Sequence, residues 1–70
     1  MTPKYPDVQV QLAGTDGNAF AILGKVRSAL RKAEAAGKIE PGACDAFHAE
    51  ATSGDYDHLL RTCMNYVDVQ

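Results

Sequence analysis

An apolar stripe between residues 19 and 33 constrains the fold more than any other feature of the chain. Its spacing of three and four residues puts every member on one side of an α-helix. The members are Ala19, Ile22, Leu23, Val26, Ala29, Leu30 and Ala33. The pattern predicts a helix over about 17–36, which Asp16 or Asn18 can cap at its start. Gly37 stands where a left-handed residue can end the helix.

Alternating sequence near the two ends of the chain predicts two strands. Apolar and polar residues alternate over 8–12 and again over 66–69, which is the period of a strand with one buried face. Two strands alone are marginally stable, so we expect them to pair with each other, parallel or antiparallel, under a helical layer. Two prolines within residues 1–6 predict a flexible leader before the first strand.

Two shorter helices are predicted between the long helix and the last strand. The first of them begins near Pro41 and ends near residue 53. Its buried residues are Ala43, Cys44, Phe47 and Ala51. Asp55 caps the second of them, whose apolar residues are Tyr56, Leu59, Leu60, Cys63 and Met64. The prediction is therefore one small α+β domain over 7–70, with the order βαααβ.

The small size of the chain favours binding over catalysis. A domain of 70 residues buries only about 60% of the surface that its unfolded chain exposes, which leaves little core for an enclosed active site. Two cysteines are too few for a disulfide framework, and no signal peptide or long apolar run is present. These features predict a cytoplasmic protein with reduced thiols and no membrane association.

Turns that contain glycine stand before the long helix and before the last one. The first, Gly14–Asn18, is either a backbone anion site at a helix start or only a tight turn capped by Asp16 or Asn18. It is not part of a nucleotide-binding P-loop, because Ala19 stands where a glycine is needed and Val26 where a hydroxyl is needed. The second, 52–55, is a helix–helix corner in which Ser53 or Asp55 satisfies backbone donors.

Candidate metal and catalytic residues are present but do not form a convincing set. Cys44 and His48 are four residues apart on a helix, whereas His58 and Cys63 are five apart and point in different directions. We therefore expect no metal and no cofactor, and both histidines to face solvent. Ser53 or Cys63 beside His58 offers a nucleophile and a base, with Asp55 as a possible third member. A buried cysteine has a raised pKa, and we predict no catalytic residues and no enzyme.

Basic residues gather on the outer side of the long helix. They are Lys25, Arg27, Arg31 and Lys32. Such a surface can contact phosphates, although the helix lacks exposed aromatic residues between them and the net charge of the chain is -2. The acidic residues concentrate in the second half of the chain, so the domain can also attract its own copy or dock an acidic protein. A solvated helix face is the simplest alternative.

Two stretches, "VQLAGTDGNAFAILGKVRSALRKA" and "AEATSGDYDHLLRT", resemble a group of small uncharacterised proteins from bacteria and their phages. The resemblance covers nearly the whole chain after the leader. It implies a small cytosolic or phage-encoded domain and no particular activity. It leaves two interpretations for the two corners, either the place for a common ligand or turns that any such fold must build. The residues concerned are Asp16, Gly17 and Asn18 in the first corner, and Ser53, Gly54, Asp55 and Tyr56 in the second.

Taken together, these features predict a non-enzymatic cytosolic interaction module that binds a protein partner or its own copy. The alternative is a bacterial or phage nucleic-acid accessory protein that uses the basic face of its first helix.

Overall fold

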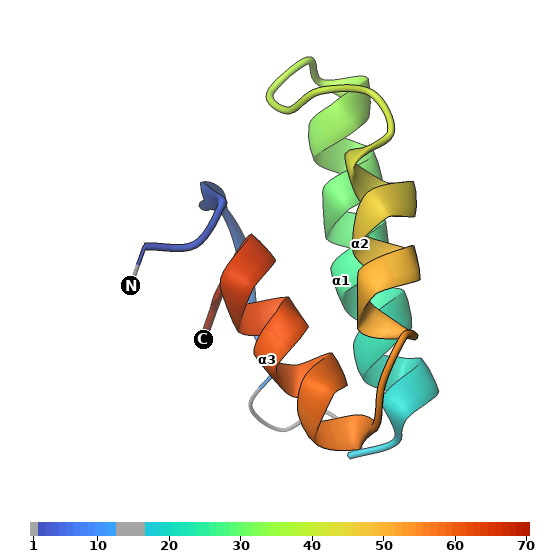
Figure 1. Ribbon diagram of the computed structural model, residues 1–70. Coiled ribbons are helices and arrows are strands. Elements are labelled where there is room, and N and C mark those ends of the chain that lie inside the picture. The colour runs from blue at the N-terminus through green and yellow to red at the C-terminus, as the bar shows by residue number, and fades with distance from the viewer. Residues whose placement is uncertain (1, 13–16) are drawn as a thin grey trace.

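A strand, three helices and a second strand follow one another in the computed structural model (Figure 1), which describes residues 2–12 and 17–70. The elements are β1 (Tyr5–Val10), α1 (Ala19–Ala35), α2 (Ala43–Ala51), α3 (Tyr56–Tyr66) and β2 (Val67–Val69). This order confirms the predicted βαααβ domain. No helix in the described part of the chain is long and apolar enough to cross a membrane.

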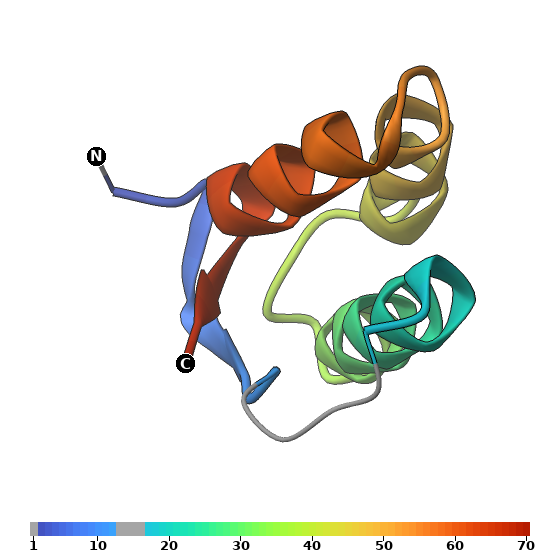
Figure 2. The ribbon, with the colours of Figure 1, turned by 90° about the horizontal axis from the view of Figure 1, so that it is seen from below.

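The two strands pair in parallel and lie at one side of the molecule, with the helices on the other (Figure 2). Val10 pairs with Val69 and Tyr5 with Val67, with an irregularity between Tyr5 and Gln9. Parallel neighbours need a long crossover connection, and the three helices provide it. The sequence left the direction of pairing open because the alternation of side chains is the same in both arrangements.

The first strand begins inside the segment that the sequence assigned to a leader, so that prediction is wrong for Tyr5 and Pro6. Tyr5 is buried, its ring lies 6.1 Å from that of Tyr66, and its hydroxyl donates to Glu40. Proline is tolerated in an edge strand, where a missing N–H has no partner to lose. At the other end the strand stops at Val10, although the Leu12 N–H still donates to the Gln70 carbonyl at 2.8 Å.

Helix α1 begins and ends close to where the sequence predicts. The side chain of Asn18 accepts a hydrogen bond from the Phe20 N–H at 2.8 Å and caps the helix, while the alternative cap, Asp16, lies outside the described residues. Gly37 adopts a left-handed φ of 74° just beyond the helix. Five residues of the apolar stripe are buried, namely Ile22, Leu23, Val26, Leu30 and Ala33.

Helix α2 begins two residues later than predicted, at Ala43 rather than Pro41. Gly42 precedes it with a left-handed φ of 91° and no side-chain cap. The Glu34 carboxylate of α1 accepts from the Cys44 N–H at 2.7 Å and so supplies a cap from another element. A cap that comes from ten residues earlier leaves no local signal in the sequence.

Helix α3 is capped as predicted, since the Asp55 carboxylate accepts from the His58 N–H at 2.9 Å. Its buried residues are Leu59, Thr62 and Cys63, whereas Tyr56 and Met64 are exposed, which corrects the predicted apolar side. Met64 follows Leu59 by five residues, which is about 140° round the helix and away from the core.

The core lies between the sheet and the helices. Its most deeply buried side chains are Phe47, Leu30, Val26, Val67 and Cys63. The Phe47 ring meets the Tyr66 ring edge-on, with 5.4 Å between their centroids. This contact fixes α2 against the end of α3, from which β2 follows directly, and thereby holds the sheet under the helices.

Candidate functional site

The two corners that the sequence singles out lie against each other in the structure. The Tyr56 hydroxyl donates to the Gly17 carbonyl at 2.7 Å and so joins the start of α3 to the start of α1. Asn18 and Asp55 use their side chains to cap these same helices. The polar groups of the described corner residues therefore bind one another or the backbone, and Asp16, the remaining corner residue, lies outside the described part of the chain.

A small apolar hollow of ≈ 270 Å³ opens between the corners. Phe20 and Leu23 of α1 line it from one side, and Tyr56 and Leu59 of α3 from the other. Phe20 is 84% exposed, which makes it the most exposed large hydrophobic residue in the described part of the chain. Phe20 was not among the predicted site residues. The available signal was its position outside the apolar stripe of α1.

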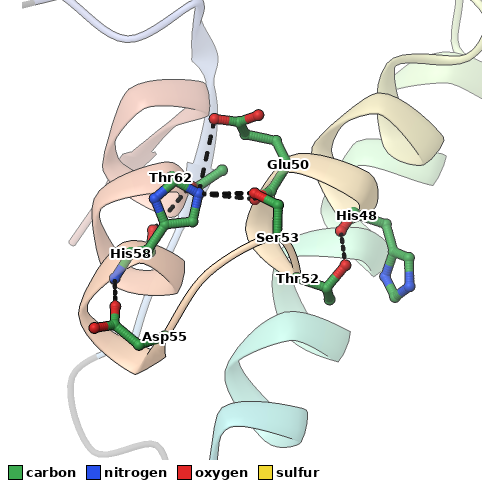
Figure 3. Close-up of polar contacts among 7 residues, drawn as sticks. All are labelled: His48, Glu50, Thr52, Ser53, Asp55, His58 and Thr62. Atoms are coloured by element: carbon green, nitrogen blue, oxygen red, sulfur yellow. Dashed lines mark hydrogen bonds and ion pairs between the residues drawn. The ribbon is translucent and has the colours of Figure 1, made fainter.

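A cluster of polar side chains fills the turn between α2 and α3 (Figure 3). It contains the serine and histidine predicted as a possible nucleophile and base, and their Ser53 Oγ and His58 Nε2 atoms are 3.2 Å apart. The Glu50 carbonyl lies between them, 2.7 Å from Ser53 Oγ and 2.9 Å from His58 Nε2. A carbonyl oxygen only accepts, so Nε2 carries a proton in this arrangement and cannot take one from Ser53.

The same cluster satisfies the end of helix α2. The last carbonyls of a helix have no partner within it. Thr52 donates to the His48 carbonyl at 2.7 Å, and the Glu50 carbonyl receives Ser53 and His58. The Asp55 carboxylate meets the backbone of His58 and not its ring. The arrangement is a helix cap, and it lacks the orientation of a catalytic triad.

Gly54 completes this turn because a side chain does not fit there. A Cβ at Gly54 would lie 2.8 Å from Cγ and 2.9 Å from Cβ of His58. Each polar or small residue of the stretch 52–55 thus has a role in the turn. The motif is explained by the fold without a ligand.

Neither cysteine is placed for nucleophilic chemistry. Cys44 and Cys63 are buried and free, and burial raises the pKa of the Cys63 thiol to about 11, as the sequence predicted for a buried cysteine. Cys63 therefore stays protonated at neutral pH. Cys44 donates to the Arg27 carbonyl at 3.6 Å.

The histidines are less exposed than the sequence predicted. Both are half-buried, and Nδ1 of His48 is buried without a hydrogen-bond partner among residues 2–12 and 17–70. In the same residues no group of three or more histidine, cysteine, aspartate or glutamate side chains lies close enough together to hold a metal ion.

A second and larger depression runs between β1 and α1. It is a groove of ≈ 680 Å³, hereafter the β1–α1 groove. Residues 7–11 line one wall, and α1 with Lys38 lines the other, while no residue of β2 takes part. Four consecutive residues of β1 and the following Gln11 meet the groove, so it follows the edge of β1 that β2 leaves free.

Backbone groups on this edge are turned away from β2. The Val10 carbonyl accepts from the Gln70 N–H, and the Leu12 N–H donates to the Gln70 carbonyl, both at 2.8 Å. Successive residues of a strand direct their N–H and C=O groups to opposite sides. The N–H and C=O groups of Gln9 and Gln11 therefore face away from β2, along the groove.

The charged residues of the groove are three lysines and one aspartate, namely Lys25, Lys32, Lys38 and Asp7. Lys25 and Lys32 belong to the basic surface predicted on α1, and their seven-residue spacing keeps them on one side of the helix. Lys38 was not among the basic residues predicted for this surface. Its place in the groove depends on the turn at Gly37, which sequence periodicity does not describe.

The other two residues of the predicted basic surface lie elsewhere. Arg27 is half-buried, and its Nε atom is buried with no hydrogen-bond partner in the described part of the chain, so it is not on the outer face as predicted. Arg31 is exposed but does not line the groove. The four basic residues predicted to form one surface therefore do not do so. Lys25 and Lys32 line the groove together with Lys38.

Comparison with protein-family models, curated proteins and solved structures finds no match to this chain. The resemblance to small bacterial and phage proteins stays a prediction.

Proposed function

We propose that this chain is a small non-enzymatic interaction module that binds a protein partner through the free edge of β1. One observation carries the proposal, namely the β1–α1 groove along residues 7–11. An extended peptide can add a strand to an exposed sheet edge, and the main-chain hydrogen bonds then supply affinity. The backbone groups of Gln9 and Gln11 are the ones available for such bonds.

The size of the groove supports a short linear segment as the bound element. A strand advances about 3.3 Å per residue, so the five residues of β1 and its continuation match a segment of similar length. The added strand would also cover a sheet edge that otherwise invites unspecific pairing. It would turn the two-stranded sheet into a three-stranded one, which is a more stable arrangement.

Two further features support binding rather than catalysis. The pair Ser53–His58 is engaged by the Glu50 carbonyl, and the thiol of Cys63 is buried with a raised pKa. A cytoplasmic location is part of the proposal, because two free buried cysteines suit a reducing compartment.

Peptide binding to edge variants tests the proposal. The partner is represented by capped peptides of alternating threonine with glutamate or with glutamine, titrated into isotope-labelled protein. Gln9→Pro removes the N–H that faces the groove, and Gln9→Thr keeps it as the matched control. We expect binding by the wild type and Gln9→Thr, with amide shifts centred on residues 7–11, and loss of binding in Gln9→Pro.

The other outcomes of this titration separate the alternatives. Binding that survives Gln9→Pro in a folded protein would contradict addition of a strand. Sedimentation at several concentrations tests whether a second copy of the chain binds along β1. Pairing of two β1 edges predicts a dimer that Gln9→Pro abolishes.

A further inference from the structure

The β1–α1 groove has a charge that differs in sign from that of the whole chain. Three lysines and one aspartate line it, whereas the net charge of the protein is -2. Resting on the proposed function, we infer that the segment bound along β1 is acidic, with carboxylates that meet the lysines across the groove.

The three lysines come from separate positions along the groove. Lys38 also lines a small depression with residues 4–8, so it lies beside the start of β1. Lys25 and Lys32 are seven residues apart on α1, which separates them by about 10 Å along the helix axis. Lysines therefore line the groove both beside the start of β1 and along α1.

Lys32 and Lys38 carry most of the argument. Both are exposed, and neither forms an ion pair within residues 2–12 and 17–70. Side chains on one face of a strand repeat every two residues, or about 7 Å. Long lysine side chains adapt to this spacing, so alternate carboxylates of a segment can meet them while its backbone pairs with β1.

A peptide fits the groove better than a nucleic acid does. No aromatic residue lines the β1–α1 groove, so no surface for base stacking is present there in the described part of the chain. Arg27 and Arg31, which would extend a phosphate-binding surface, do not line it. The strand edge offers N–H and C=O groups in a spacing that a peptide backbone matches and a phosphate backbone does not.

The experiment compares two peptides that differ only in charge, one alternating threonine with glutamate and the other threonine with glutamine. We expect the glutamate peptide to bind about fivefold tighter at low salt, as two surface ion pairs of ordinary strength would give. High salt should reduce this preference. The double substitution Lys32→Gln with Lys38→Gln should abolish it.

Arg31→Gln is the matched control, because it removes a positive charge next to Lys32 but outside the groove. The preference should persist in this variant. Equal binding of both peptides by the wild type would overturn the inference and leave the proposed function standing, whereas failure of both peptides would overturn the proposed function itself. Tighter binding of an oligothymidine at the same residues would overturn the inference in favour of nucleic acid.

Discussion

The turn between α2 and α3 and the β1–α1 groove use polar groups in opposite ways. In the turn, Ser53, His58 and the Glu50 carbonyl bind one another (Figure 3). In the groove, Lys32 and Lys38 form no ion pair within residues 2–12 and 17–70, and the backbone of Gln9 and Gln11 faces away from β2. The difference teaches that the polar residues of the turn maintain the fold. The groups available to a partner lie instead along β1, whose sequence carries no recognisable motif.

The largest expected effect tests whether the turn is structural. Gly54→Ala puts a Cβ within 3.0 Å of the His58 ring, and we expect it to lower the free energy of unfolding by about 2 kcal/mol. Urea denaturation measures this. In a His58→Gly background, which removes the Cβ as well as the ring of residue 58, the same substitution should cost at most about 0.5 kcal/mol, since the clash is gone. An equal cost in both backgrounds would show that the contact is not the cause.

A smaller effect is expected from the hydroxyl of the turn. Ser53→Ala removes one hydrogen bond to the Glu50 carbonyl, which keeps its bond from His58. We expect a loss of about 0.5 kcal/mol in the free energy of unfolding, measured in the same way, and unchanged peptide binding. Weaker peptide binding by a stable Ser53→Ala protein would mean that the turn belongs to the binding site.

The contact between Tyr5 and Glu40 extends the comparison to the start of β1, because there, as in the turn, the polar groups of the two side chains bind each other. Burial, and then the hydrogen bond to Glu40, raise the pKa of Tyr5 to about 12, so its stabilising effect is complete below pH 10 and is lost as the pH rises from about 10 towards 12. The hydrogen bond from Tyr5 lowers the pKa of Glu40, so that contribution is lost as the pH falls through the lowered value.

Tyr5→Phe removes both effects. We expect the free energy of unfolding of this variant to depend less on pH than that of the wild type. The difference should appear between about pH 10 and 12, where Tyr5 titrates, and at acid pH, where Glu40 titrates. Thermal unfolding across the pH range measures it. A dependence as steep as that of the wild type would show that other groups are responsible.

The smallest effect is expected at the apolar hollow. Phe20 is 84% exposed, so Phe20→Ser should change the free energy of unfolding by at most about 0.5 kcal/mol. It should also leave peptide binding unchanged, because Phe20 does not line the β1–α1 groove. A loss of binding in this variant would show that the peptide binds at the corners and not in the groove.

Local patterns predict much of this fold. The apolar stripe of α1, the caps at Asn18 and Asp55 and the left-handed Gly37 depend on neighbours a few residues away, and all four are confirmed. The start of β1 was missed because two nearby prolines indicated a leader. The contacts that hold Tyr5 in place, with Tyr66 and Glu40, join distant parts of the chain.

The candidate site could be predicted only in part. Gly17 and Tyr56 meet, but the bond between them serves the fold. The groove was not foreseen, because it exists only once the strands pair in parallel and α1 lies beside the outer edge of β1. Lys25 and Lys32 were predicted as part of a basic surface. Lys38 lies in the same groove because the chain turns at Gly37, which no sequence periodicity predicts.

Amide hydrogen exchange, followed residue by residue with and without the glutamate peptide, tests the central claim most directly. Addition of a strand predicts that the N–H groups of Gln9 and Gln11 exchange at least about tenfold more slowly when the peptide is bound. The amides of residues 53–58 should not change. Unchanged exchange at Gln9 and Gln11 under saturating peptide, or protection confined to 17–20 and 53–58, would contradict the account.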